Sequence, residues 1–163
     1  MTEPDRPSWG SGTAADRLVA LGLARPAVAA PVGSYVPAVR DGDLVLTSGQ
    51  LPFVDGALPA TGKVGAEVDP QRAVELARVA AVNAVAAVHE VVGDLERVVQ
   101  VVKVVGFVAS APDFTGQPGV INGASDVLAE IFGDAGRHAR SAVGVAVLPL
   151  DAPVEVEITV RVR

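Results

Sequence analysis

The segment 154–162 alternates strictly between apolar and polar residues, and this pattern constrains the fold more than any other feature of the chain. Val and Ile occupy one face, whereas the other carries Glu155, Glu157, Thr159 and Arg161. A period of two residues predicts a β-strand with one face against a core. The chain is therefore expected to build a sheet in which this segment is one strand.

Four further segments have the composition of strands: 36–39, 44–48, 98–109 and 141–148. Asp41-Gly42 lies between the first two, and this dipeptide is typical of a tight hairpin. The last two are apolar at almost every position, which is typical of strands buried on both faces.

Three segments have the apolar spacing of helices: 13–23, 70–92 and 118–132. Asp69 can cap the free amides at the start of the second, and Pro70 suits its first helical position. Gly93 is a suitable residue to end it. The loop 54–68 precedes this helix.

These elements predict an α+β fold with a mixed sheet. The polar segment 1–12 is interpreted as a disordered tail, 13–31 as an N-terminal helix and linker, and 32–163 as the main domain. Two long helices can cover only one face of the sheet, although 98–109 and 141–148 are predicted to be buried on both. A second copy of the chain is therefore expected to cover the other face. The alternative is that Val-rich strands reflect biased composition.

Composition excludes several kinds of site and partner. The 163 residues contain no cysteine, and the formal net charge of −6 disfavours binding to a phosphate backbone. The two histidines, His89 and His138, are far apart in sequence, so no metal site is expected. His89 is interpreted as a structural residue on a helix face, and His138 as a loop residue without a catalytic role. The start of the chain lacks the pattern of a signal peptide, and no long apolar run predicts a membrane span. The expected location is the cytoplasm.

Arg140 directly precedes the apolar run 141–148, so its guanidinium is expected at the edge of a dry layer. Such a charge requires a carboxylate partner, and its planar fork can bind one with two hydrogen bonds. From position alone, that partner is either an internal acidic residue or a ligand.

Four other polar residues are candidates for a site. Glu155 is either a solvated strand residue paired with Lys103 or Arg161 or, if a neighbouring subunit covers it, a proton-transfer group with a raised pKa. Tyr35 and Ser48 flank the predicted hairpin, and Asn122 lies in the third helix. Each of these three has a purely structural alternative.

Several segments together resemble the RidA family, also called YjgF-like proteins and formerly described as L-PSP endoribonucleases or translation inhibitors. The similarity covers roughly 32–162, and its most specific part is Ala139-Arg140-Ser141-Ala142-Val143 followed by Leu148-Pro149 and Val154-Glu155-Val156-Glu157. Other matching stretches are Leu44 to Pro52, the helix containing Asn83, Val101 to Val104, and Asp113-Phe114 leading to Asn122.

This resemblance implies a chorismate-mutase-like fold assembled as a homotrimer around a central barrel, with clefts between subunits. It implies hydrolysis of enamines and imines of small 2-amino acids to 2-keto acids and ammonia, without a cofactor. Arg140 matches the family arginine that holds the substrate carboxylate, and Glu155 matches the glutamate associated with the attacking water. Tyr35, Ser48 and Asn122 match positions that line the cleft.

The chain departs from the family pattern at Ser34, where proline is usual, and at His138, where proline is common before Ala-Arg. The deaminase hypothesis requires Arg140 and Glu155 to face one cleft. A non-catalytic module that binds a small carboxylate through Arg140 is the main alternative, and a ribonuclease is disfavoured by acidity.

Overall fold

The computed structural model describes residues 7–163, which form one mixed sheet with helices on one side. Its strands have the spatial order β1 (Ala38–Asp41), β2 (Leu44–Thr47), β5 (Val154–Val162), β3 (Val98–Ala109) and β4 (Ala139–Val145). The helices are α1 (Thr13–Ala20), α2 (Pro70–Val92) and α3 (Gln117–Phe132), and short 3-10 turns occupy Leu95–Arg97, Gly133–Gly136 and Pro149–Asp151. The α+β class expected from the sequence is confirmed.

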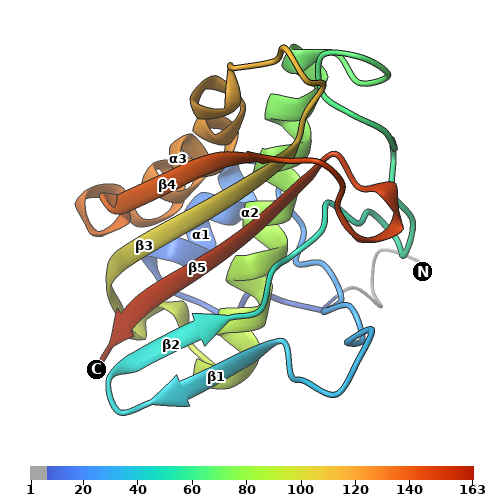
Figure 1. Cartoon of the computed structure of the whole chain (residues 1–163). Coiled ribbons are helices and arrows are strands. Elements are labelled where there is room, and N and C mark those ends of the chain that lie inside the picture. The colour runs from blue at the N-terminus through green and yellow to red at the C-terminus, as the bar shows by residue number, and fades with distance from the viewer. Residues whose placement is uncertain (1–6) are drawn as a thin grey trace.

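All three helices lie behind the sheet in Figure 1, and no element of the described chain covers the front face. The apolar side of β5 packs towards the helices, where Val156 and Val160 are fully buried. The polar side of the same strand faces the open side, so the predicted alternation is confirmed.

Helix α2 begins and ends where the sequence predicts. The carboxylate of Asp69 accepts a hydrogen bond of 2.8 Å from the amide of Gln71, and Pro70 occupies the first turn. Gly93 ends the helix with φ of 73°, a left-handed conformation that glycine adopts without strain. Ala and Val residues along the helix provide much of the core.

The predicted hairpin is also present, displaced by two residues in its first strand. β1 and β2 pair antiparallel, with Asp41 opposite Leu44. Gly42 lies between them with φ of 61°. The chain therefore reverses at the Asp-Gly dipeptide.

The single chain leaves 98–109 and 141–148 partly exposed, and their cover by a second copy stays a prediction. β4 starts at Ala139 and lies at the sheet edge, parallel to β3, with Val143 44% exposed. Val102 of β3 is 37% exposed on the same molecule. Small apolar residues indicate that a segment can be buried. They do not indicate whether the same chain or another one packs against it. The strand also ends before Pro149, which has no amide to continue a ladder.

The expectation of a disordered tail is wrong for residues 7–12, whereas residues 1–6 lie outside the described part of the chain. Trp9 is 4% exposed, and its indole N–H donates a 2.7 Å hydrogen bond to the carbonyl of Leu23. The backbone carbonyl of Trp9 lies 3.1 Å from Nε2 of His89 on α2. The N-terminal segment is therefore packed against α2, and α1 contributes Leu18 to the same core.

None of the helices within residues 7–163 is both long enough and apolar enough to cross a membrane.

Candidate functional site

The five expected site residues come from four parts of the fold. Arg140 is the second residue of β4, and Glu155 is the second residue of β5. Tyr35 and Ser48 lie just before and just after the β1–β2 hairpin, and Asn122 lies in α3.

Arg140 points towards α3, where three uncharged oxygens receive its guanidinium. Nη1 donates to Oδ1 of Asn122 at 2.9 Å and to Oγ of Ser125 at 3.2 Å. Nη2 donates to the carbonyl of Pro118 at 3.2 Å. The structure therefore brings Arg140 and Asn122 together, as expected of two residues of one site.

These contacts leave part of the guanidinium available. An arginine has five N–H groups, and three of those of Arg140 are used, so two remain within the described chain: one on Nε and one on Nη2. The two nitrogens are neighbours in the planar fork, whose spacing matches the two oxygens of a carboxylate. No ion pair of Arg140 occurs within residues 7–163, so the internal acidic partner considered from the sequence is not found there.

Glu155 lies on the other face of the sheet, in a shallow pocket of about 70 Å³ that Tyr35 also lines. Pro31 and Val32, from the segment before β1, also line this pocket, and so do Gln50 and Phe53, from the segment after β2. Tyr35 is 48% exposed, and its hydroxyl oxygen accepts a 3.2 Å hydrogen bond from the amide of Val32.

The carboxylate of Glu155 lies directly over the backbone of Gly49. A Cβ built at Gly49 would be 1.8 Å from Oε1 of Glu155, so any side chain at this position would require the carboxylate to move. The Ser48-Gly49-Gln50 segment thus permits the close approach that a glycine at a strand end makes possible. Ser48 itself donates a 2.6 Å hydrogen bond from Oγ to the carbonyl of Val36 and holds the start of the hairpin.

The environment of Glu155 raises the pKa of its carboxyl group. Burial raises the pKa of this carboxyl above its ordinary value, and the negative charge of Glu157 on the same face raises it further. Neither Lys103 nor Arg161 forms an ion pair with Glu155 in the described chain, and Lys103 donates instead to Oγ of Ser141 at 3.0 Å.

Arg140 and Glu155 do not share a pocket within one chain. Val104 of β3 is opposite Arg140, whereas Phe107 of β3 is opposite Glu155. The two residues are thus separated by three positions along the strands, about 10 Å, and by two strand spacings, again about 10 Å. They also extend from opposite faces of the sheet, since Arg140 contacts α3 and Glu155 is on the open side.

His138 and Ser125 are polar neighbours of Arg140 that were not among the expected site residues. The hydroxyl of Ser125 is 2.9 Å from Nε2 of His138 as well as 3.2 Å from Arg140. The sequence contained a signal for both. His138 and Arg140 are two residues apart beside a strand, and Asn122 and Ser125 are three apart on a helix, so each pair shares a face.

No group of three or more His, Asp or Glu side chains within residues 7–163 is arranged to hold a metal ion.

Comparison with known proteins places this geometry in a family. Residues 15–160 match the family described as "YjgF/chorismate_mutase-like, putative endoribonuclease". The chain is 45% identical to Protein TCP17 of Trypanosoma cruzi over 154 residues, 94% of this chain and 96% of that protein. It is 35% identical to the 2-iminobutanoate/2-iminopropanoate deaminase of Escherichia coli K12 over 133 residues, 81% of this chain and 91% of that enzyme.

Solved structures agree with these matches. An Agrobacterium tumefaciens protein of unknown function has 43% identity and a TM-score of 0.86, covering 93% of this chain and 94% of its own. Escherichia coli TdcF, solved with bound serine, has 30% identity and a TM-score of 0.60, covering 82% of this chain and 91% of its own.

Proposed function

This chain belongs to the YjgF/chorismate mutase-like family, also called RidA, and we propose that it hydrolyses small reactive 2-imino acids and their enamine tautomers to 2-keto acids and ammonia. The observation that carries the proposal is the arrangement of Arg140. Its guanidinium is oriented by uncharged oxygens and retains two neighbouring N–H groups for a carboxylate. A relative of 35% identity is named a deaminase of such acids.

The cleft is proposed to form between two subunits of a homotrimer. In one chain Arg140 and Glu155 are on opposite faces, so only a neighbouring copy can bring the Glu155 pocket to the Arg140 edge. The open face supports this assembly because it presents apolar side chains to solvent, among them Leu46 and Val143, each 44% exposed. β4 also leaves its outer edge unpaired at this side of the sheet.

In the proposed reaction Arg140 binds the substrate carboxylate and thereby fixes the face of the C=N carbon. Glu155 of the neighbouring subunit accepts a proton from a water as the water oxygen bonds to that carbon. The imine nitrogen takes a proton from solvent as its double bond becomes single, which gives a carbinolamine. The amine nitrogen then takes the proton held by Glu155 and the C–N bond breaks. Ammonia leaves as the hydroxyl proton passes to solvent and the C=O bond forms. Tyr35, Ser48 and Asn122 are proposed to line the cleft. The raised pKa of Glu155 suits it to return its proton to the leaving nitrogen.

A regulatory module that binds a small carboxylate without turnover is the second candidate. It is favoured by the separation of Arg140 from Glu155 within one chain, because the Arg140 site can bind an anion without the Glu155 pocket. The net charge of −6 disfavours the endoribonuclease description.

The proposal is tested by measuring 2-keto acid and ammonia release from 2-iminopropanoate and 2-iminobutanoate that an amino-acid oxidase generates in situ. The wild type is expected to exceed the spontaneous rate, and Arg140→Ala and Glu155→Gln are expected to lose that excess. Arg137→Ala is the matched control, because the Arg137 side chain is 86% exposed and its ion pair within residues 7–163 is a 3.8 Å contact with Asp134. A folded wild-type oligomer with no acceleration would exclude deamination of these acids. Saturable carboxylate binding without turnover would favour the regulatory module.

A further inference from the structure

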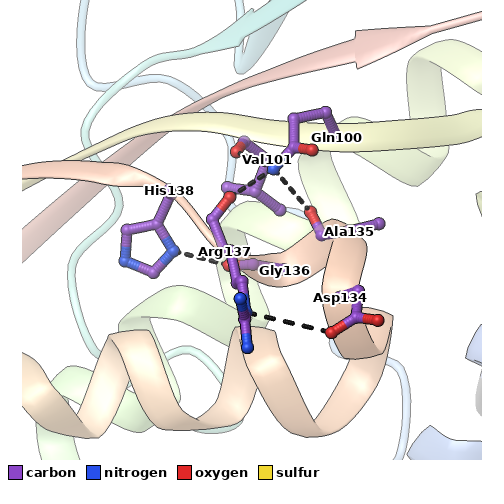
Figure 2. Close-up of polar contacts among 7 residues, drawn as sticks. All are labelled: Gln100, Val101, Asp134, Ala135, Gly136, Arg137 and His138. Atoms are coloured by element: carbon purple, nitrogen blue, oxygen red, sulfur yellow. Dashed lines mark hydrogen bonds and ion pairs between the residues drawn. The ribbon is translucent and has the colours of Figure 1, made fainter.

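A chain of hydrogen bonds connects His138 to the guanidinium of Arg140, and the direction of each bond can be assigned. Nδ1 of His138 lies 2.6 Å from the carbonyl of Gly136, as Figure 2 shows. A carbonyl oxygen can only accept, so Nδ1 carries a proton, and we assign the ring as the Nδ1–H tautomer. Nε2 is then an acceptor, and the hydroxyl of Ser125 donates to it at 2.9 Å.

This direction determines what Ser125 offers to Arg140. Once its hydroxyl hydrogen points at His138, the oxygen presents lone pairs to Nη1 of Arg140 at 3.2 Å. Asn122 accepts from the same nitrogen at 2.9 Å. Nη1 is therefore fully used, and the guanidinium plane cannot rotate without breaking a bond to α3.

The turn that carries His138 is itself fixed to the sheet. Figure 2 shows the side-chain amide of Gln100 from β3 reaching the carbonyls of Arg137 and of Ala135, the latter at 3.3 Å. His138 is thus held in two places. Gln100 of β3 bonds the turn that precedes it, and Ser125 of α3 bonds its ring.

We propose that His138 and Ser125 are positioning residues that hold the Nε–Nη2 edge of Arg140 towards the substrate carboxylate. The proposal rests on the proposed function, because it assigns the geometry of the same carboxylate site. His138 acts as a hydrogen-bond acceptor and touches no substrate atom. The residue commonly found at this position in the resembled family is proline, which has no side chain that could accept such a bond.

Two pairs of substitutions separate this role from a merely structural one. His138→Gln places an acceptor oxygen near the position of Nε2 and can keep the hydrogen bond from Ser125. His138→Asn can keep the hydrogen bond to the carbonyl of Gly136 but is too short to reach Ser125. Ser125→Thr keeps the hydroxyl, whereas Ser125→Ala removes it. We expect His138→Asn and Ser125→Ala to raise KM about fivefold to tenfold, the effect of one lost hydrogen bond, with kcat changed less. His138→Gln and Ser125→Thr are expected to remain within about twofold of wild type.

The binding constant of 2-ketobutanoate, measured by calorimetry, gives a second readout that does not depend on turnover. It should weaken in the same two variants. Adding His138→Asn to Ser125→Ala should weaken binding no further, since His138 reaches Arg140 only through the Ser125 hydroxyl. In the Arg140→Ala background neither should change residual binding.

The outcomes distinguish the two proposals. Binding of 2-ketobutanoate without imine turnover would refute the deaminase while the variants still decide the positioning role. A lower melting temperature in Ser125→Ala and His138→Asn with unchanged KM and unchanged binding would show that the network only fastens α3 to β4. Equal losses in the Asn and Gln variants would also overturn the proposal, and so would a wild type that binds no carboxylate.

Discussion

The contact between Glu155 and the backbone of Gly49 makes Gly49→Ala a selective probe of the proposed water-activating group. A Cβ at position 49 would lie 1.8 Å from Oε1 of Glu155, and ordinary contact begins at 3.4 Å, so the carboxylate must move by about 1.6 Å. Only the end of a flexible side chain is displaced. The cost in stability is therefore that of a shifted rotamer, ~0.5–1.5 kcal/mol, partly offset by the lower unfolded-state entropy of alanine.

The expected result is a large loss of activity with a small loss of stability. A displacement of this size can reduce a rate by about 10²-fold, whereas ~1 kcal/mol changes the melting temperature of a chain of this length by only about 2–4 °C. Steady-state imine hydrolysis and thermal unfolding are measured on Gly49→Ala, on Glu155→Ala and on the double variant.

Because Glu155→Ala removes the colliding atoms, Gly49→Ala should have no further effect on activity in that background. Gly123→Ala is the contrast, since its Cβ would meet the backbone carbonyl of Val74 at 2.0 Å and should destabilise the fold itself. Wild-type turnover in Gly49→Ala would refute the role of Glu155, and a melting temperature as low as that of Gly123→Ala would refute the claim of selectivity.

Three further predictions concern charge and packing. Glu157→Gln should move the acidic limb of the pH profile of kcat/KM to lower pH, because Glu157 raises the pKa of Glu155; an unmoved limb would remove Glu155 as the titrating group. Trp9→Ala should lower the free energy of unfolding by ~3–5 kcal/mol in urea titrations, whereas a tail without packing would change it by almost nothing. Burial, and then the charge of Arg25, lower the pKa of His89 in the folded state. The contribution of neutral His89 to the free energy of unfolding should therefore be fully present above about pH 6.5, and it should decline as pH falls from there towards the folded pKa. Unfolding midpoints measured from neutral to mildly acidic pH should show this decline, and His89→Gln should reduce it.

The sequence predicted elements best where local signals were strong. Helix α2 matches its prediction at both ends because Asp69, Pro70 and Gly93 mark its ends, and β5 matches because its alternation is strict. β4 begins two residues before the predicted segment 141–148 and ends three residues before its end, because no local pattern marks the ends of a strand at a sheet edge. Trp9 illustrates the same limit, since a polar segment can be ordered by one buried aromatic side chain.

The site was predictable in parts. Arg140 was a candidate because it directly precedes the apolar run 141–148, and Asn122 was a candidate through the family resemblance. The structure joins these two residues at 2.9 Å. The sequence did not show that Glu155 and Arg140 extend from opposite faces, because the register of β5 and β4 on β3 fixes this and is a tertiary property. His138 was interpreted as a loop residue without a catalytic role, although its two-residue spacing from Arg140 implies a shared face.

The central claim is that one cleft combines Arg140 of one subunit with Glu155 of its neighbour, and mixed oligomers test it most directly. Arg140→Ala and Glu155→Gln proteins, each inactive alone, are dissociated, mixed in equal amounts and reassembled, and formation of mixed oligomers is verified by native mass spectrometry. With random mixing about one quarter of the clefts combine both intact residues, so roughly a quarter of wild-type imine hydrolysis should return. Mixed oligomers that remain as inactive as their parents would contradict the claim.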